Sequence, residues 1–196
     1  MRLAPKDREE LSEFKGFFDV VEASMGFVPN SLPTLARKPA LLKGFAALAQ
    51  AALPPEGEAV SRPLLQMCAV VASAASGCRY CQAHTSTTAA RLGVAPEKVA
   101  DLWLYETSER FDAAERAALR YAQAAAESPG RADDALRADA IAWHGEDGLV
   151  EITAVVALFG FLNRWNDAMA TELEPEPRAF AEAHLTAHGW EAGKHA

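Results

Sequence analysis

Two cysteines and a histidine lie close together in the segment Gly-Cys-Arg-Tyr-Cys-Gln-Ala-His, residues 77–84. Cys78 and Cys81 are three positions apart, so on a helix their sulfurs share one face and come within bonding distance. If the helix begins near Cys78, the unpaired N–H groups of its first turn favour thiolate over thiol. This arrangement predicts a dithiol for two-electron reduction of a peroxide or disulfide, in which one thiolate attacks and the second closes a disulfide.

The residues around the two cysteines could assist this chemistry. His84 follows Cys81 by three positions, so its imidazole can reach the Cys81 sulfur or its proton; the alternative for His84 is a solvated or core histidine. Arg79 adds positive charge nearby. Tyr80 is either a hydrogen-bond donor in the site or a packed ring, and packing is the favoured interpretation.

A metal site is the main alternative for the cysteines. Cys78, Cys81, Cys68 and His84 could form a ligand set, but structural zinc sites usually draw on two separated pairs, and the sequence has no second pair. We therefore expect no metal. Inert thiols are the remaining alternative, and Cys68 is expected to be a small hydrophobic residue within a buried helix.

The composition indicates an all-α protein. Of 196 residues, 42 are Ala, the strongest helix former, whereas aromatic residues make up only 8%. A formal net charge of −8 argues against nucleic acid and anionic membrane as partners. No apolar signal-peptide core or membrane-spanning stretch is evident, so we expect a cytoplasmic protein in a reducing compartment.

The hydrophobic spacing predicts helices and no strand of useful length. A turn is expected over 174–177, and the long apolar segment near the C-terminus is expected to be buried. The predicted helices cover 7–25, 32–37, 40–53, 61–76, 78–92, 95–105, 111–127, 133–143, 151–170 and 179–188.

We predict one domain over residues 1–196. Its parts are an N-terminal helix and turn (1–30), a helical hairpin that carries the cysteine pair (61–93), a C-terminal helical layer (111–170) and a tail (171–196).

Several of these segments resemble the carboxymuconolactone decarboxylase and alkyl hydroperoxidase D (AhpD) superfamily, specifically its peroxidase-related branch. The resemblance implies an all-α, AhpD-like helical bundle with the Cys-x-x-Cys at the start of a central helix, assembled as a dimer, trimer or hexamer. The segments that carry it are the apolar helix Leu64–Ser76 with the following Gly-Cys-Arg-Tyr-Cys-Gln-Ala-His, the segments 25–30, 111–117 and 159–167, and the tail 189–195.

The resemblance also implies roles for individual residues. Cys81 would attack the peroxide and Cys78 would resolve the intermediate. The family's relay glutamate, twelve residues before the first cysteine, corresponds to Gln66, and a histidine four residues after the second cysteine corresponds to Thr85. Because an amide does not titrate, Gln66 cannot relay a proton as a carboxylate does. It could still orient His84 or a water, or be a satisfied polar residue on a buried helix.

The remaining candidates carry less chemistry. Trp165, Asn163 and Asn166 cluster near the end of the long apolar segment, where helix capping and interface packing are the favoured explanations and pocket lining the alternative. The other histidines lie among polar residues and are expected to be solvated: His144, His184, His188 and His195.

Taken together, the sequence predicts a thiol-dependent hydroperoxide or disulfide reductase with Cys81, Cys78 and His84 as catalytic residues. No cofactor is required, and the expected partners are a peroxide and an external dithiol reductant. The alternative is an oligomeric helical protein that senses redox state or binds a ligand without turnover. Lactone decarboxylation is less favoured, because members of the superfamily with that activity generally lack the Cys-x-x-Cys.

Overall fold

The N-terminal part of the chain is a group of short helices. The computed structural model describes residues 4–54 and 58–196, so residues 1–3 of the predicted 1–30 unit lie outside it. Phe18, Leu35 and Leu42 are fully buried within this group. Its elements are the 3-10 segment η1 (Arg8–Phe14) and the helices α1 (Lys15–Met25), α2 (Ser31–Leu35) and α3 (Pro39–Ala52).

A helical hairpin follows, formed by α4 (Arg62–Ala75) and α5 (Arg79–Arg91). Ser61 caps α4 by accepting a hydrogen bond from the Leu64 N–H at 3.4 Å. The chain reverses at Gly77, whose φ of +71° is a left-handed conformation that glycine adopts without the strain imposed by a Cβ. The helices predicted over 61–76 and 78–92 correspond to α4 and α5, and Cys78 is the N-cap residue of α5.

The next elements cover the hairpin on its other sides. They are α6 (Pro96–Ala100), the 3-10 segment η2 (Asp101–Leu104), α7 (Ala113–Ala126) and α8 (Asp134–Met169). α7 starts with a capping box between Asp112 and Glu115. The two helices predicted over 133–143 and 151–170 are one long element, α8, interrupted only where Gly145 leaves helical geometry at φ +73°.

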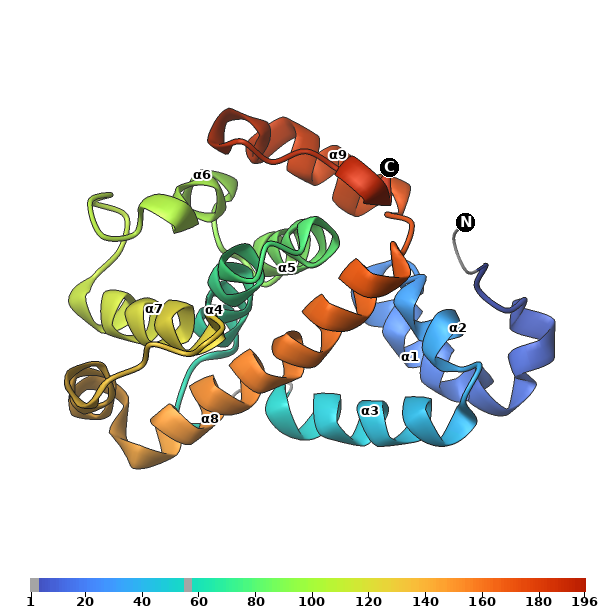
Figure 1. Cartoon of the computed structure of the whole chain (residues 1–196), viewed down its shortest axis with the longest axis horizontal. Helices are drawn as coiled ribbons and strands as arrows, with labels where there is room; N and C mark the ends of the chain where they lie inside the picture. The colour runs from blue at the N-terminus through green and yellow to red at the C-terminus, as the bar shows by residue number, and fades with distance from the viewer. Residues whose placement is uncertain (1–3, 55–57) are drawn as a thin grey trace.

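The C-terminal segment packs on α5 instead of extending from the domain. It contains α9 (Pro175–His184) and the 3-10 segments η3 (Thr186–His188) and η4 (Gly193–His195). The turn expected over 174–177 is in fact the N-terminal turn of α9, with Pro175 at its first position, where a missing N–H costs nothing. Figure 1 shows α9 in red above α5, with α4 and the diagonal α8 below.

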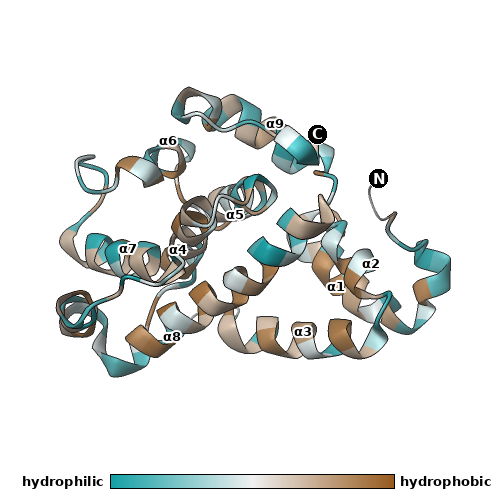
Figure 2. Ribbon diagram, viewed as in Figure 1, coloured by the Kyte–Doolittle hydropathy of each residue, from teal (hydrophilic) through white to brown (hydrophobic). Residues whose placement is uncertain are grey.

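The fold is all-α, as predicted: all regular elements of residues 4–54 and 58–196 are helical. Figure 2 shows hydrophilic positions recurring along α8, the longest helix. Within the described ranges, every helix is too short or too polar to cross a membrane.

Candidate active site

The cysteine pair sits at the N-terminus of α5. The Cys81 N–H donates to the Cys78 sulfur at 3.3 Å, so the thiol side chain caps its own helix. Both residues are buried, with exposed fractions of 0% and 2%, and both sulfurs are free thiols. The predicted placement of two sulfurs in one helical turn is therefore what the fold produces.

The two thiols differ in their electrostatics. The pKa of Cys78 is lowered mainly because the Cys81 thiol donates a hydrogen bond to its sulfur. The backbone N–H groups of Cys81 and Tyr80 lower this pKa further. Together these hydrogen bonds outweigh the burial of Cys78, which alone would raise its pKa. Burial raises the pKa of Cys81 well above its usual range, and its donation to Cys78 raises it further. Of the two thiols, Cys78 is therefore the more acidic, and Cys81 is the one that holds its proton more strongly.

The third cysteine is not part of this pair. Cys68 is fully buried in α4, and burial raises the pKa of its thiol to about 12. This environment keeps the thiol protonated and unreactive, in agreement with its prediction as a small hydrophobic residue.

An amide from α8 approaches the second sulfur. Asn166 Nδ2 donates to Cys81 Sγ at 3.5 Å, while Asn166 Oδ1 is buried without a hydrogen-bond partner in the described part of the chain. Asn163, one turn earlier, is also buried, and its amide atoms are likewise unpaired there. Trp165 faces elsewhere: its ring stacks on Phe161, 6.2 Å between centroids, against the N-terminal helices. Of this predicted cluster, only Asn166 contacts a sulfur.

A carboxylate that sequence reasoning missed organises the other face of α5. Glu174, the N-cap residue of α9, accepts from Tyr80 Oη at 2.9 Å and from the Asn30 N–H at 2.5 Å through Oε1. Its Oε2 lies 2.6 Å from His84 Nε2. His84 therefore directs Nε2 at a buried acid and not at the Cys81 sulfur.

The titration of this network follows from its contacts. Burial by itself would raise the pKa of Glu174, but the charge and hydrogen bond of His84 and the N–H of Asn30 outweigh it, and the net pKa is lowered. Burial, followed by the nearby Glu174 charge, raises the pKa of Tyr80 well above its usual range. At neutral pH the acid is therefore ionised and the phenol is protonated, so the phenol donates to the carboxylate.

Rings from distant parts of the chain enclose this network. The ring centroids of Tyr80 and His84 lie 4.3 Å apart, and the ring centroid of Phe27 lies 5.5 Å from that of His84. His195, in the tail, lies 5.8 Å from Tyr80. The prediction that His195 is solvated was wrong: it is 1% exposed, and its Nδ1 bonds the Thr171 carbonyl at 2.8 Å, because the tail folds back onto α5.

Of the two family positions that differ in this sequence, Gln66 on α4 bonds the backbone of α5, and Thr85 bonds within α5 itself. Gln66 Nε2 donates to the Thr85 carbonyl at 3.2 Å, and Thr85 Oγ1 donates to the Cys81 carbonyl at 2.7 Å. These contacts give Gln66 the character of a satisfied buried polar residue that ties α4 to α5. The acid beside His84 is instead Glu174.

Across residues 4–54 and 58–196, no three side chains of His, Cys, Asp or Glu are grouped so that they could hold a metal ion.

Comparison with known proteins places this site in a family. The sequence pattern of the carboxymuconolactone decarboxylase family matches residues 39–124, which include α4 and the cysteine pair. A peroxidase-related protein of Silicibacter sp. TM1040 is 25% identical, with a TM-score of 0.74 over 84% of this chain and 86% of that one. The chain belongs to the carboxymuconolactone decarboxylase/AhpD superfamily.

The chain is also similar to the debrominase Bmp8. A Bmp8 variant with one cysteine changed to alanine, in complex with 2,3,4-tribromopyrrole, is 32% identical, with a TM-score of 0.86 over 92% of this chain and 95% of that one. Protein YnjA of Escherichia coli K12 is 34% identical over 110 residues, and the chain spans only 56% of that relative's length. The AhpD-like fold is also seen in a Ralstonia eutropha protein at 22% identity and a TM-score of 0.80.

A signal for the missed acid was present in the sequence. Glu174 precedes Pro175, and a proline after a polar residue is typical of a helix start. Because Pro175 and Pro177 are both prolines, the sequence also favours a turn over 174–177. Nothing in the local pattern shows that this helix start lies beside a residue 90 positions earlier.

Proposed function

We propose that this protein is a dithiol-dependent reductase of hydroperoxides, with Cys81 and Cys78 as its redox pair. The observation that carries the proposal is a thiol pair at a helix N-terminus, with the pKa of Cys78 lowered, beside the buried Tyr80–Glu174–His84 network. The pair supplies two electrons, and the network, whose Tyr80 and His84 flank Cys81 along α5, supplies a proton. Peroxidase-related relatives in the same superfamily support this assignment.

The first step forms a bond between sulfur and oxygen. The Cys78 thiolate accepts the proton of Cys81 as the Cys81 sulfur attacks the terminal oxygen of the hydroperoxide R–O–OH. The O–O bond breaks, Cys81 becomes a sulfenic acid, and the departing alkoxide takes the thiol proton and leaves as an alcohol. Asn166, which donates to the Cys81 sulfur, holds that sulfur in place.

The second step closes the disulfide. Cys78 attacks the sulfenic sulfur, the S–O bond breaks, and the departing hydroxide leaves as water after taking a proton from the Tyr80–Glu174–His84 network. One alcohol, one water and one disulfide are produced. An external dithiol then returns two electrons and two protons, one proton to Cys81 and one to the network.

The test combines thiol counting with turnover. Reduced protein treated with one equivalent of cumene hydroperoxide is expected to lose two thiols, located by mass spectrometry at Cys78 and Cys81. With dithiothreitol or dihydrolipoamide supplied, peroxide consumption should continue over many cycles. Oxidation of both cysteines without turnover would instead identify a redox sensor.

Reductive dehalogenation is a second candidate, favoured by the similarity to the debrominase Bmp8 over most of both chains. In that reaction the attacking sulfur takes bromine from carbon, and the carbon takes a proton from the network. The second cysteine then displaces bromide and forms the disulfide. Bromopyrroles with one to four bromines serve as probes: bromide release with dithiol supplied, at a rate above peroxide consumption, would favour this activity.

Self-association also stays a prediction. The isolated chain exposes several large apolar side chains, which a homo-oligomer would cover: Val20, Leu48, Trp103, Leu104, Ile141, Trp143 and Val150. Sedimentation at micromolar concentration is expected to show a dimer, trimer or hexamer, and a stable monomer would contradict the prediction.

A further inference from the structure

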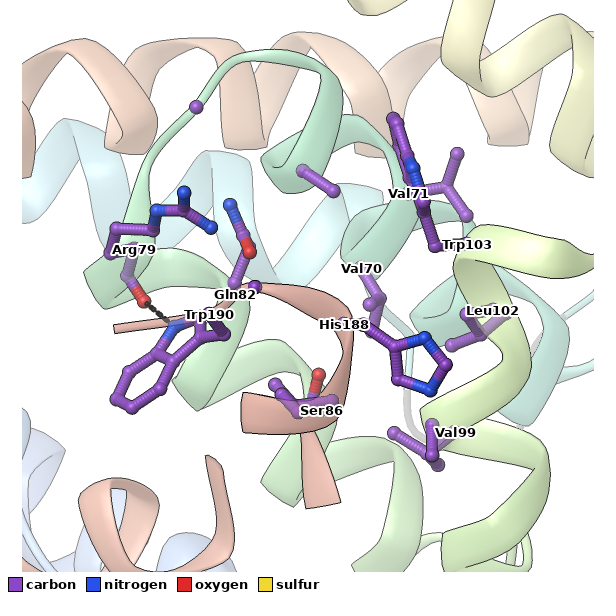
Figure 3. A pocket seen from close by; sticks show the side chains of 15 residues that line it. Val70, Val71, Arg79, Gln82, Ser86, Val99, Leu102, Trp103, His188 and Trp190 are labelled. Carbon is purple, nitrogen blue, oxygen red and sulfur yellow. Dashed lines mark hydrogen bonds between the residues drawn. The ribbon is translucent and has the colours of Figure 1, made fainter. Parts of the chain in front are cut away.

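A cavity of about 290 Å³ lies on the side of α5 opposite to His84. It is bounded by α4, α5, the α6–η2 segment and the tail after α9, and neither sulfur of the redox pair lines it. Arg79, Gln82 and Ser86 lie on one stripe of α5, at helical spacing, and face it together. Figure 3 shows Arg79 and Gln82 side by side near Trp190, with His188, Leu102 and Val99 at the other end.

One polar group of this cavity, the Ser86 hydroxyl, is buried and unpaired. Ser86 is 0% exposed, and its hydroxyl has no hydrogen-bond partner among the described residues. Its neighbours on α5 behave differently, since Thr85, Thr87 and Thr88 each donate to the carbonyl four residues earlier. The Ser86 hydroxyl is thus free for a group that enters the cavity, and leaving it unpaired costs stability.

The charge of the lining selects one class of ligand. Arg79 is the cation of the lining, and the lining contains no Asp or Glu. In a chain of net charge −8, a cavity with an arginine and no carboxylate favours an anion. The amide of Gln82, 8% exposed, adds a hydrogen-bond donor and acceptor on the same stripe.

The remaining walls are apolar and partly aromatic. Val70, Val71, Val99 and Leu102 line one side. The Trp190 indole is held rigidly, because its Nε1 donates to the Arg79 carbonyl at 3.1 Å. Trp103, half exposed, lies at the opening. A flat apolar body with one anionic end matches these walls, and the volume is at the small end of the usual range for ligand pockets.

We propose that this cavity binds a small aromatic carboxylate, with its carboxylate on Arg79 and the Ser86 hydroxyl and its ring between the indoles and the valine wall. The site is separate from the redox pair and does not depend on which electrophile that pair reduces.

Calorimetric titration of the full chain with indole-3-acetate and with uncharged indole-3-acetamide tests the proposal. We expect saturable binding of the acid at concentrations up to about 1 mM, at least about 10-fold tighter than the amide. Arg79→Gln should remove this preference and leave amide binding unchanged. Arg91→Gln is the matched control, because Arg91 lies on the same helix but pairs with Glu176 outside the cavity.

Two further variants separate binding from folding. Ser86→Ala removes an unpaired hydroxyl, so it should fold as well as the parent chain while binding the acid several-fold more weakly. Ser86→Leu should fill the cavity and block both ligands, with the circular dichroism spectrum confirming an intact helical fold. Absence of saturable acid binding to the parent chain, or binding unaffected by Arg79→Gln and Ser86→Ala, would overturn the proposal.

Discussion

The two sides of α5 carry similar numbers of polar side chains but differ in whether these side chains have hydrogen-bond partners. On one side Tyr80 and His84 are both bonded to Glu174, so the network is complete within the chain. On the other side Arg79, Gln82 and Ser86 face a cavity, and the Ser86 hydroxyl is buried without a partner in the described structure. A completed network holds charge in a fixed geometry, whereas an unpaired one requires a group from outside. Under the two proposals above, one helix would combine a prearranged proton source with a site for a ligand.

The largest effect is expected from the two cysteines between these sides. Cys81→Ser should lower peroxide turnover by on the order of 10³-fold or more, since the attacking sulfur is lost. Cys78→Ser should form a sulfenic acid on Cys81 and then stall, because no second thiol resolves it. Dimedone trapping with mass spectrometry locates the sulfenic acid. If it appears on Cys78 in the Cys81→Ser variant, the order of attack is the reverse of the one proposed.

A substitution at Glu174 breaks the completed side. Glu174→Gln keeps the size and shape of the side chain but removes its negative charge. Turnover should therefore fall by about 10²-fold, as for loss of a general acid–base group. Glu176→Gln is the matched control, because Glu176 lies two residues later and is exposed at the surface. Steady-state rates with saturating dithiol measure both. Equal rates for the two variants would show that the Tyr80–Glu174–His84 network does not contribute to catalysis.

This carboxylate also marks the limit of what the sequence predicted. The α4–α5 hairpin and the cysteine geometry follow from local signals: the Ser61 cap, the glycine at 77 and the i, i+3 spacing. The Glu174 contact depends on how the tail packs on α5, which no local pattern specifies. For the same reason the sequence predicts a solvated His195, and it gives no indication that the acid beside His84 comes from the N-terminus of α9.

The ionisation of Glu174 gives the two sides a different dependence on pH. Its pKa is lowered from 4.5 in the folded chain, so the pair with His84 stabilises the fold above that pH. This contribution should be lost as pH falls through the lowered folded value, where both states bind the proton. Chemical denaturation from pH 7 to pH 3 should show the parent chain losing its stability advantage over Glu174→Gln. A difference that stays constant over this range would contradict a stabilising role for the ionised Glu174 carboxylate.

The smallest effect on turnover is expected at Gln66, although its spacing matches the family's acid. Gln66→Glu would place a carboxylate against the Thr85 carbonyl, to which the amide now donates at 3.2 Å. The change should destabilise the fold by about 1–3 kcal/mol, because a buried acceptor replaces a donor, and turnover should not rise. Gln66→Met, of similar volume, is the control and should cost less than about 1.5 kcal/mol. Denaturation midpoints and peroxide rates measured on the same preparations decide the matter. Faster turnover in Gln66→Glu would show that a second carboxylate can serve the thiols from α4, whereas lower stability at an unchanged rate leaves proton transfer with Glu174.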